Sequence, residues 1–306
     1  MKRSLAGTNA YDDGTGIWPL PEGDLREHGF RFTIADVRPT RDVRPAAVAG
    51  LFYPAEPEAL RARIAHCLNA SGPYGSDGAA RPPKMVIVPH AGYEYSGAVA
   101  AHAYARLSGR RDPVKRVVLI GPAHRAALRA MALPGVDAFE TPLGLVPLDQ
   151  AATADLDGLA QVRRDDLPHA GEHSLEVQLP FLQEVLDEFT LVPIVAGEAR
   201  PAEVAQVLVR LWGGDETCIV VSSDLSHYLP HVRAQLVDRA TAQQILEFDA
   251  RLDPQQACGA TPINGALLAA RDHGLVPRLL DLRDSGQITG DLRRVVGYGA
   301  FAFESP

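Results

Sequence analysis

Three stretches of this chain each follow a short apolar run: Pro89-His90-Ala91-Gly92-Tyr93, Gly121-Pro122-Ala123-His124 and Ser222-Ser223-Asp224-Leu225-Ser226-His227. The preceding runs are Val86-Ile87-Val88, Val117-Val118-Leu119-Ile120 and Ile219-Val220-Val221. Runs this short, β-branched and apolar on both faces are typical of parallel strands that helices cover on each side. Polar residues just past the carboxyl ends of such strands lie at one edge of the sheet, where open α/β proteins bind ligands. We therefore expect the histidines and the aspartate of these stretches to converge in one crevice.

Helical and extended patterns alternate along the rest of the chain. The predicted helices span residues 57–69, 97–107, 173–188, 202–212 and 232–248, and a further one opens at Thr261-Pro262 and ends at Gly274. Thr261 is expected to be its N-cap, and Pro180 to kink the 173–188 helix or to start a second segment. The predicted strands span residues 85–88, 117–120, 191–195, 218–221 and 295–303. This alternation predicts an α/β fold with a mostly parallel or mixed central sheet flanked by helices.

The first 44 residues differ from the rest. They are rich in Gly, Asp and Arg, and they predict an irregular extension with one short strand at residues 30–37. Residues 45–306 are expected to form the α/β domain. A hydrophobic content of 46% gives this domain ample material for a core.

Composition argues against several classes of protein. A net charge of −8 disfavours a nucleic-acid binder, which usually carries a basic face. The sequence has no uninterrupted apolar run of membrane-spanning length, and no apolar core follows the basic start at Met1-Lys2-Arg3. Three scattered cysteines are too few for a disulfide framework. We therefore expect a cytoplasmic protein without membrane or nucleic-acid partners.

His90 and His124 occupy equivalent positions after predicted strands, so a shared metal site becomes as well supported as two separate structural roles. Cys258 precedes Gly-Ala-Thr-Pro at a predicted helix start, where a thiolate is favoured. The alternative for Cys258 is a buried thiol packed as a small hydrophobe. Imidazole together with thiolate favours Fe(II), Cu or Zn over Mg or Ca.

Asp224 and His227 stand three residues apart on a predicted tight turn. They are candidates for proton transfer near a metal-bound substrate, with Asp224 as the orienting partner. The alternative is a helix-capping Asp with a solvent-facing His.

Two histidine pairs, His169/His173 and His227/His231, have the spacing of helical zinc motifs but do not match H-E-x-x-H. Gly171 and Pro230 interrupt them. His173 and Glu176 can face the same way on one helix and line the crevice, and such a cap-and-face role is the favoured interpretation of the 172–176 segment.

Together these residues resemble the Memo family, whose bacterial members are also called AmmeMemoRadiSam system protein B. The resemblance runs from about Pro45 to Phe303 and is strongest at residues 89–97, 121–124, 172–180, 222–227 and 258–263. It implies a fold similar to class III extradiol dioxygenases, which are non-haem Fe(II) enzymes. It also implies a metal centre whose ligands are His90, His124 and Cys258, with Asp224 and His227 as the other polar residues of the cleft.

The dioxygenases of that fold carry a carboxylate where this chain has Cys258, which weakens an inference to ring cleavage. The resemblance implies instead a redox role with iron or copper, or with zinc as a further candidate, and an unknown small molecule or peptide in the cleft. One alternative is a non-catalytic scaffold that partners a protein of a radical-SAM pathway. A third hypothesis is a zinc hydrolase with His227 as general base or fourth ligand.

Overall fold

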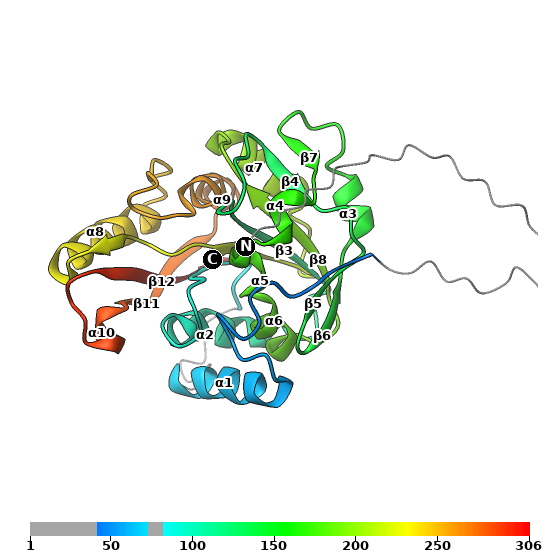
Figure 1. The fold of residues 1–306 in the computed structure, drawn as a ribbon. Helices are drawn as coiled ribbons and strands as arrows, with labels where there is room; N and C mark the ends of the chain where they lie inside the picture. The colour runs from blue at the N-terminus through cyan, green and yellow to red at the C-terminus, as the bar shows by residue number, and fades with distance from the viewer. Residues whose placement is uncertain (1–41, 73–81) are drawn as a thin grey trace, which may run out of the picture. The chain divides into compact units, whose positions relative to one another are not determined.

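A mixed β-sheet forms the centre of the molecule in the computed structural model, which describes residues 42–72 and 82–306 (Figure 1). Within these residues the sheet has nine strands, in the order β10-β12-β2-β9-β3-β8-β4-β7, with β11 also paired to β12. Their bounds are β2 Met85–Val88, β3 Arg116–Pro122, β4 Met131–Leu133, β7 Val162–Arg164, β8 Thr190–Ala196, β9 Thr217–Ser222, β10 His227–Leu229, β11 Val276–Asp284 and β12 Val295–Glu304.

The four central strands β2, β9, β3 and β8 are parallel, and β12 pairs antiparallel with β2. This mixture confirms the predicted fold class. A smaller sheet of three strands, β1 (Val43–Arg44), β5 (Ala138–Thr141) and β6 (Gly144–Pro147), lies beside the main one. The predicted strand at residues 30–37 lies outside the described residues, and the predicted domain boundary after residue 44 stays a prediction.

Helices cover both faces of the main sheet. Val86 and Val88 pack into one hydrophobic cluster with α1 (Pro57–Ala70), α2 (Gly97–Leu107) and α6 (Leu179–Val185). Met85 and Ile87 pack into the opposite cluster with α7 (Pro201–Arg210), α8 (His231–Leu246) and α9 (Ala260–Asp272). Because alternate residues face two different apolar layers, the central strands are continuous apolar runs in the sequence.

The remaining helices are short: η1 Ser108–Arg110, α3 Gln150–Ala154, α4 Leu167–Ala170, α5 His173–Glu176 and α10 Gly286–Thr289. The predicted 173–188 helix is therefore two helices, α5 and α6. Pro180 is in the first turn of α6, where its missing N–H breaks no hydrogen bond. The second of the two alternatives for Pro180 is thus the observed one.

The N-cap predicted at Thr261 is wrong. Helix α9 begins at Ala260 with Gly259 as its N-cap, because the Gly259 carbonyl already accepts the amide of Ile263. A Cβ on Gly259 would lie 2.6 Å from Ser223 Cβ, so glycine allows the helix start to pack against the end of β9.

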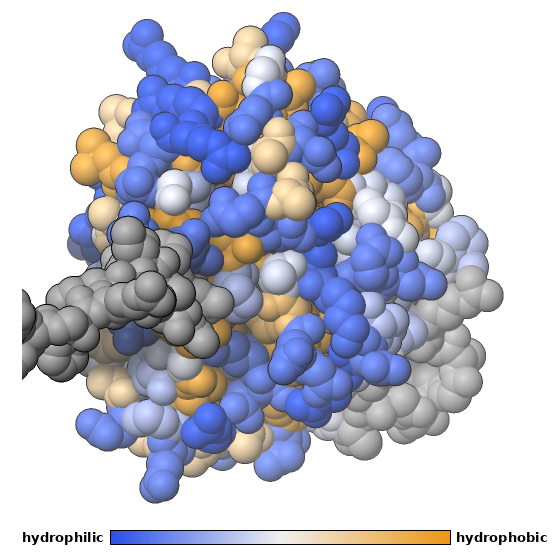
Figure 2. All heavy atoms as spheres, turned by 90° about the vertical axis from the view of Figure 1, so that its right-hand side faces the viewer, coloured by the Kyte–Doolittle hydropathy of each residue, from blue (hydrophilic) through white to orange (hydrophobic). Residues whose placement is uncertain are grey.

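The surface in Figure 2 is mostly hydrophilic, with hydrophobic residues scattered among polar ones. None of the described helices is both long and apolar enough to cross a membrane.

Candidate metal centre

Three residues follow the central strands at the same distance from their ends. Strands β2, β3 and β9 end at Val88, Pro122 and Ser222, and His90, His124 and Asp224 each stand two positions further along the chain. The parallel register pairs Val88 with Ser222 and Ile120 with Val221, so these strand ends are adjacent. The expected convergence at one sheet edge is therefore observed for these three residues.

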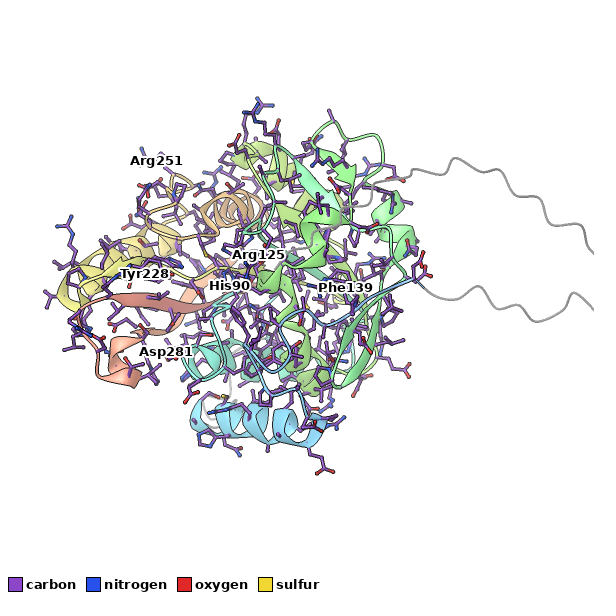
Figure 3. The ribbon with its side chains drawn as sticks, viewed as in Figure 1. His90, Arg125, Phe139, Tyr228, Arg251 and Asp281 are labelled. Carbon is purple, nitrogen blue, oxygen red and sulfur yellow. The ribbon has the colours of Figure 1, made fainter. Side chains whose placement is uncertain are left out.

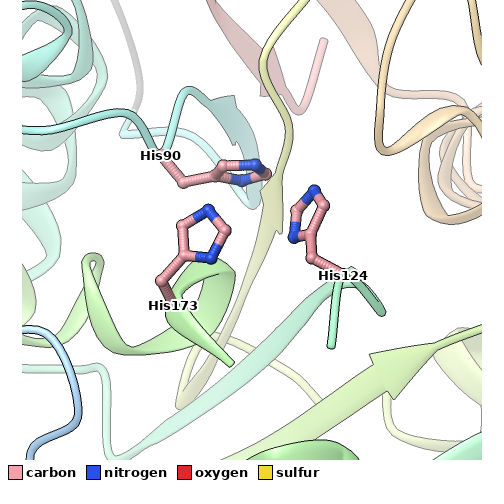
Figure 4. A group of neighbouring side chains, drawn as sticks. All are labelled: His90, His124 and His173. Atoms are coloured by element: carbon pink, nitrogen blue, oxygen red, sulfur yellow. The ribbon is translucent and has the colours of Figure 1, made fainter. Parts of the chain in front are cut away.

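His90, His124 and His173 form a compact group (Figure 4). Each offers a ring nitrogen that lies within 4.8 Å of the other two. The ring centroids are 5.1 Å apart for His90 and His124, 5.3 Å for His90 and His173, and 4.7 Å for His124 and His173. Three imidazoles at this spacing are a donor set suited to zinc, copper or iron.

Hydrogen bonds fix the tautomer of His90, whose side chain is buried. Ser222 Oγ donates its single hydrogen to the Ser174 carbonyl at 2.6 Å and accepts an N–H from Gln178 at 2.8 Å. His90 Nδ1, 2.8 Å from the same oxygen, must therefore be the donor. The Nε2 lone pair of His90 is left for a ligand. Burial, aided by the neighbouring histidines, lowers the pKa of His90 well below its usual value, so the ring is neutral.

Glu172 holds His124. One carboxylate oxygen accepts the His124 amide at 2.6 Å, and the other lies 2.9 Å from Nδ1. Burial alone would raise the pKa of Glu172, but the hydrogen bonds from His124 and from the Ser174 amide outweigh it and lower the pKa to about 2. An ionised carboxylate only accepts, so His124 Nδ1 is the donor and Nε2 is again free for a metal.

His173 begins α5 and stacks on His124 at an interplanar angle of 28°. On its other side the Phe52 ring lies at a centroid distance of 4.7 Å. Its Nδ1 is 3.3 Å from Glu172 Oε1 but makes no hydrogen bond there. Burial lowers the pKa of His173 to about 4, so this ring is also neutral and can act as a ligand.

Cys258 borders the histidine group through His90, whose Nε2 is 3.3 Å from the sulfur. Burial and the charge of Asp224 raise the pKa of the Cys258 thiol to about 12, so it is protonated in the metal-free protein. Of the three predicted ligands, His90 and His124 belong to the compact group, together with His173 in place of Cys258. Ligation by Cys258 stays a prediction.

Asp224 and His227 lie next to the same group. The buried Asp224 carboxylate accepts the His90 amide at 2.7 Å, and β10 rather than a helix follows it, so it does not cap a helix. Burial raises the pKa of Asp224 to about 6, although the amide of His90 and the charge of His227 oppose the shift. His227 Nδ1 donates to the Leu225 carbonyl at 2.8 Å. Proton transfer by either residue stays a prediction.

Two clefts meet at Cys258. The larger, of about 690 Å³, also contains His124, His227, Tyr228 and Arg233. The smaller, of about 600 Å³, lies along Pro122, Ala123, Leu128 and Thr261. The larger cleft gives a ligand access to the histidine group, since His124 lines it.

Sequence reasoning missed His173 as a candidate ligand, because it assigned the 172–176 segment a capping role. The capping part of the prediction is correct, because the Glu172 carboxylate accepts the Ser174 amide at 2.9 Å. The expectation that Glu176 also lines the crevice is wrong. Since α5 lasts a single turn, Glu176 lies instead against Arg44, 2.7 Å from its guanidinium.

The histidine pairs spaced as in helical zinc motifs do not form metal sites. His169 Nε2 is 3.0 Å from the Ala132 carbonyl, and His231 is paired with Asp284 at 2.9 Å. Gly171 and Pro230 place the members of each pair in different elements, as their positions in the sequence suggested.

Comparison with known proteins gives one consistent result. The family described as Memo-like protein matches residues 44–302. A MEMO1 family protein of Methanopyrus kandleri is 38% identical, over 85% of this chain and 98% of its own length. MEMO1 family proteins of Methanothermobacter thermautotrophicus and Methanosarcina barkeri are each 36% identical, over 84% and 86% of this chain and 98% and 100% of their own lengths.

A more distant solved structure, the uncharacterized protein JW3007 from Escherichia coli K12, aligns with a TM-score of 0.46 at 12% identity. The alignment covers 71% of this chain and 98% of that chain. The sequence relatives, rather than this alignment, establish what the chain is similar to.

Proposed function

The chain belongs to the Memo family, and on that premise we propose that it is a cytoplasmic metal-dependent redox protein acting on a small ligand in the larger cleft. The observation that carries the proposal is the compact group of three imidazoles at the sheet edge. Two of them have Nδ1 committed to protein partners, which orients Nε2 for a metal.

We propose iron or copper as the metal, with zinc as the third candidate. Three protein ligands leave coordination positions open for a substrate, and the thiol of Cys258 is 3.3 Å from one of the ligands. A bound Fe(II) or Cu would supply one-electron chemistry. His227 Nε2 would accept a proton from the cleft ligand, and Asp224 would hold the His90 backbone in place.

The volume of the larger cleft supports a small molecule, rather than a folded protein, as the ligand. Its volume of about 690 Å³ lies within the range typical of small-molecule sites. Arg233 lines it without an ion-pair partner among the described residues, so it can bind an anionic group of the ligand.

Metal binding by untagged protein, prepared anaerobically, tests the proposal. We expect the wild type to bind Fe(II) or Cu stoichiometrically, and His173→Gln to weaken binding by more than about tenfold, the lower limit seen for groups that merely orient ligands. His66→Gln, at an exposed histidine of α1, is the matched control. Titration calorimetry and metal analysis give the affinities and stoichiometries.

The same titration separates the alternatives. If wild type, His173→Gln and Cys258→Ala all bind equally little iron, copper or zinc, the metal proposal is wrong. A loss in Cys258→Ala as large as in His173→Gln would make the sulfur a ligand. Turnover with zinc that needs no oxygen would favour a hydrolase.

One observation favours a second function, that of a protein-binding module. Strand β10 and the start of α8 expose three large apolar side chains. Tyr228, labelled in Figure 3, is 61% exposed, Val232 is 69% exposed and Leu236 is 60% exposed. Such an apolar patch is suited to a protein partner, for which a radical-SAM pathway protein is the candidate. Co-purification with that protein, lost in Val232→Asp but kept in the ligand variants, would support this function.

A further inference from the structure

We propose that Arg44 and Glu176 are positioning residues for the metal centre, and that they act as a clamp between the segment 43–53 and the turn that carries Glu172 and His173. The inference rests on the proposed metal site and adds to it two residues that touch neither metal nor ligand.

Arg44 binds the turn at three points. Its Nε donates to the His169 carbonyl at 2.7 Å, Nη2 to the Glu172 carbonyl at 2.8 Å, and Nη1 to Glu176 Oε2 at 2.7 Å. The side chain is 5% exposed and its guanidinium lies over the Phe139 ring, 4.9 Å from the centroid. A planar group with donors in fixed directions is required here, and an ammonium group cannot reproduce this pattern.

Glu176 completes the clamp from the other side. It is fully buried, and its two oxygens accept the amides of Ala47 and Val48 at 2.8 and 2.9 Å and the hydroxyl of Tyr53 at 2.6 Å. With Arg44 these bonds satisfy the carboxylate, so the segment 43–53 and helix α5 form one rigid unit.

The clamp reaches two of the three histidines. Arg44 binds the main chain of Glu172, and the Glu172 carboxylate binds both the amide and Nδ1 of His124. Phe52 of the same segment packs on His173. A turn at Gly50, whose φ of +80° suits glycine, carries the chain to this contact.

His90 is held by other groups, namely Ser222 at the end of β9 and Asp224 on the loop that follows. The metal centre thus has one histidine fixed by the sheet and two fixed by the clamp. Loss of the clamp should therefore affect His124 and His173 more directly than His90, whose partner Ser222 contacts α5 only through the Ser174 carbonyl.

Co(II) binding followed by visible absorption tests the clamp, because its d–d bands report coordination geometry. We expect Arg44→Met to weaken Co(II) binding by at least tenfold and to change the band shape, and Arg44→Lys to recover only part of the affinity. Arg116→Met is the matched control. Like Arg44→Met, it removes an arginine–carboxylate bond of 2.7 Å, here from Nε to Asp149, but at the opposite end of β3 from His124.

Folding is checked in each variant by circular dichroism. A folded Arg44→Met with the wild-type Co(II) affinity and spectrum would overturn the inference, as would an equal loss in Arg116→Met. If Arg44→Met does not fold, Tyr53→Phe decides, since it removes one hydrogen bond from Glu176. A weakened or altered Co(II) site in Tyr53→Phe supports the clamp, and an unchanged one refutes it. Failure of the wild type to bind Co(II), iron, copper or zinc would instead refute the metal site itself.

Discussion

Cys258 presents its sulfur to two clefts and to His90, yet the raised pKa of its thiol makes it a poor nucleophile in the metal-free protein. With a pKa of about 12 the thiolate fraction at pH 8 is on the order of 10⁻⁴. We expect alkylation of Cys258 by iodoacetamide to be slow at pH 7 and to accelerate about tenfold per pH unit up to pH 9. Mass spectrometry of the Cys258 peptide measures the rate.

Cys258→Ser identifies the signal, because Cys67 and Cys218 are buried elsewhere. Alkylation at pH 7 as fast as that of free cysteine would contradict the conclusion that burial raises the pKa of the Cys258 thiol. Protection by added metal in the wild type, absent in His173→Gln, would link the sulfur to the histidine group.

Some residues of the site are positioned by the strand next to them in the sequence, and others by contacts with distant parts of the chain. His90, His124 and Asp224 could be predicted from sequence because each follows a strand that is recognisable by itself. His173 could not, because its position depends on contacts with residues more than a hundred positions away in the segment 43–53. Neither spacing nor periodicity reports such contacts.

At the level of elements, prediction succeeded where burial is uniform. Strands β2, β3, β8, β9 and β12 were predicted because they are apolar on both faces. Strand β11 was missed because it is an exposed, charged strand that depends on pairing with β12. Strands β4 and β7 have three residues each, too few to give a pattern.

The contact between α7 and α9 gives a test at this scale. A Cβ on Gly265 of α9 would overlap Val204 and lie 3.0 Å from the Pro201 carbonyl. Overpacking costs about 1–3 kcal/mol, whereas alanine improves helix propensity by about 1 kcal/mol. Because the carbonyl cannot move freely, we expect Gly265→Ala to lower the free energy of unfolding by at least about 1 kcal/mol in urea titrations.

Gly171→Ala is the control, since its φ of −116° is ordinary and a Cβ there meets no atom within 4 Å. It should change the free energy of unfolding by less than about 0.5 kcal/mol. Equal free energies of unfolding for wild type and Gly265→Ala would mean that α7 and α9 move apart to accommodate the methyl group without loss of stability.

For the whole molecule, His169 couples stability to pH. Its side chain is 2% exposed, and burial lowers its pKa to about 4, with a smaller contribution from Arg44. The unfolded chain, with a pKa near 6.5, takes up the proton first, so the free energy of unfolding falls as the pH drops from 6.5 toward 4. This residue should account for about 2 kcal/mol between pH 7 and pH 5.

Urea titrations of wild type and His169→Gln at both pH values isolate the effect, with His66→Gln as the exposed control. The glutamine variant should lose about 2 kcal/mol less than wild type on acidification. Parallel losses in wild type and His169→Gln would show that His169 is protonated without penalty.

The place of β12 in the sheet has a consequence for synthesis. This strand, residues 295–304, lies between β11 and the strand that leads to His90. A nascent chain can pair β2 with β9, and β9 with β3, as soon as residue 222 has left the ribosome. It cannot cover the other edge of β2 until about 80 further residues have been added. At the pace of translation, this leaves an unpaired apolar edge for several seconds, a target for chaperones.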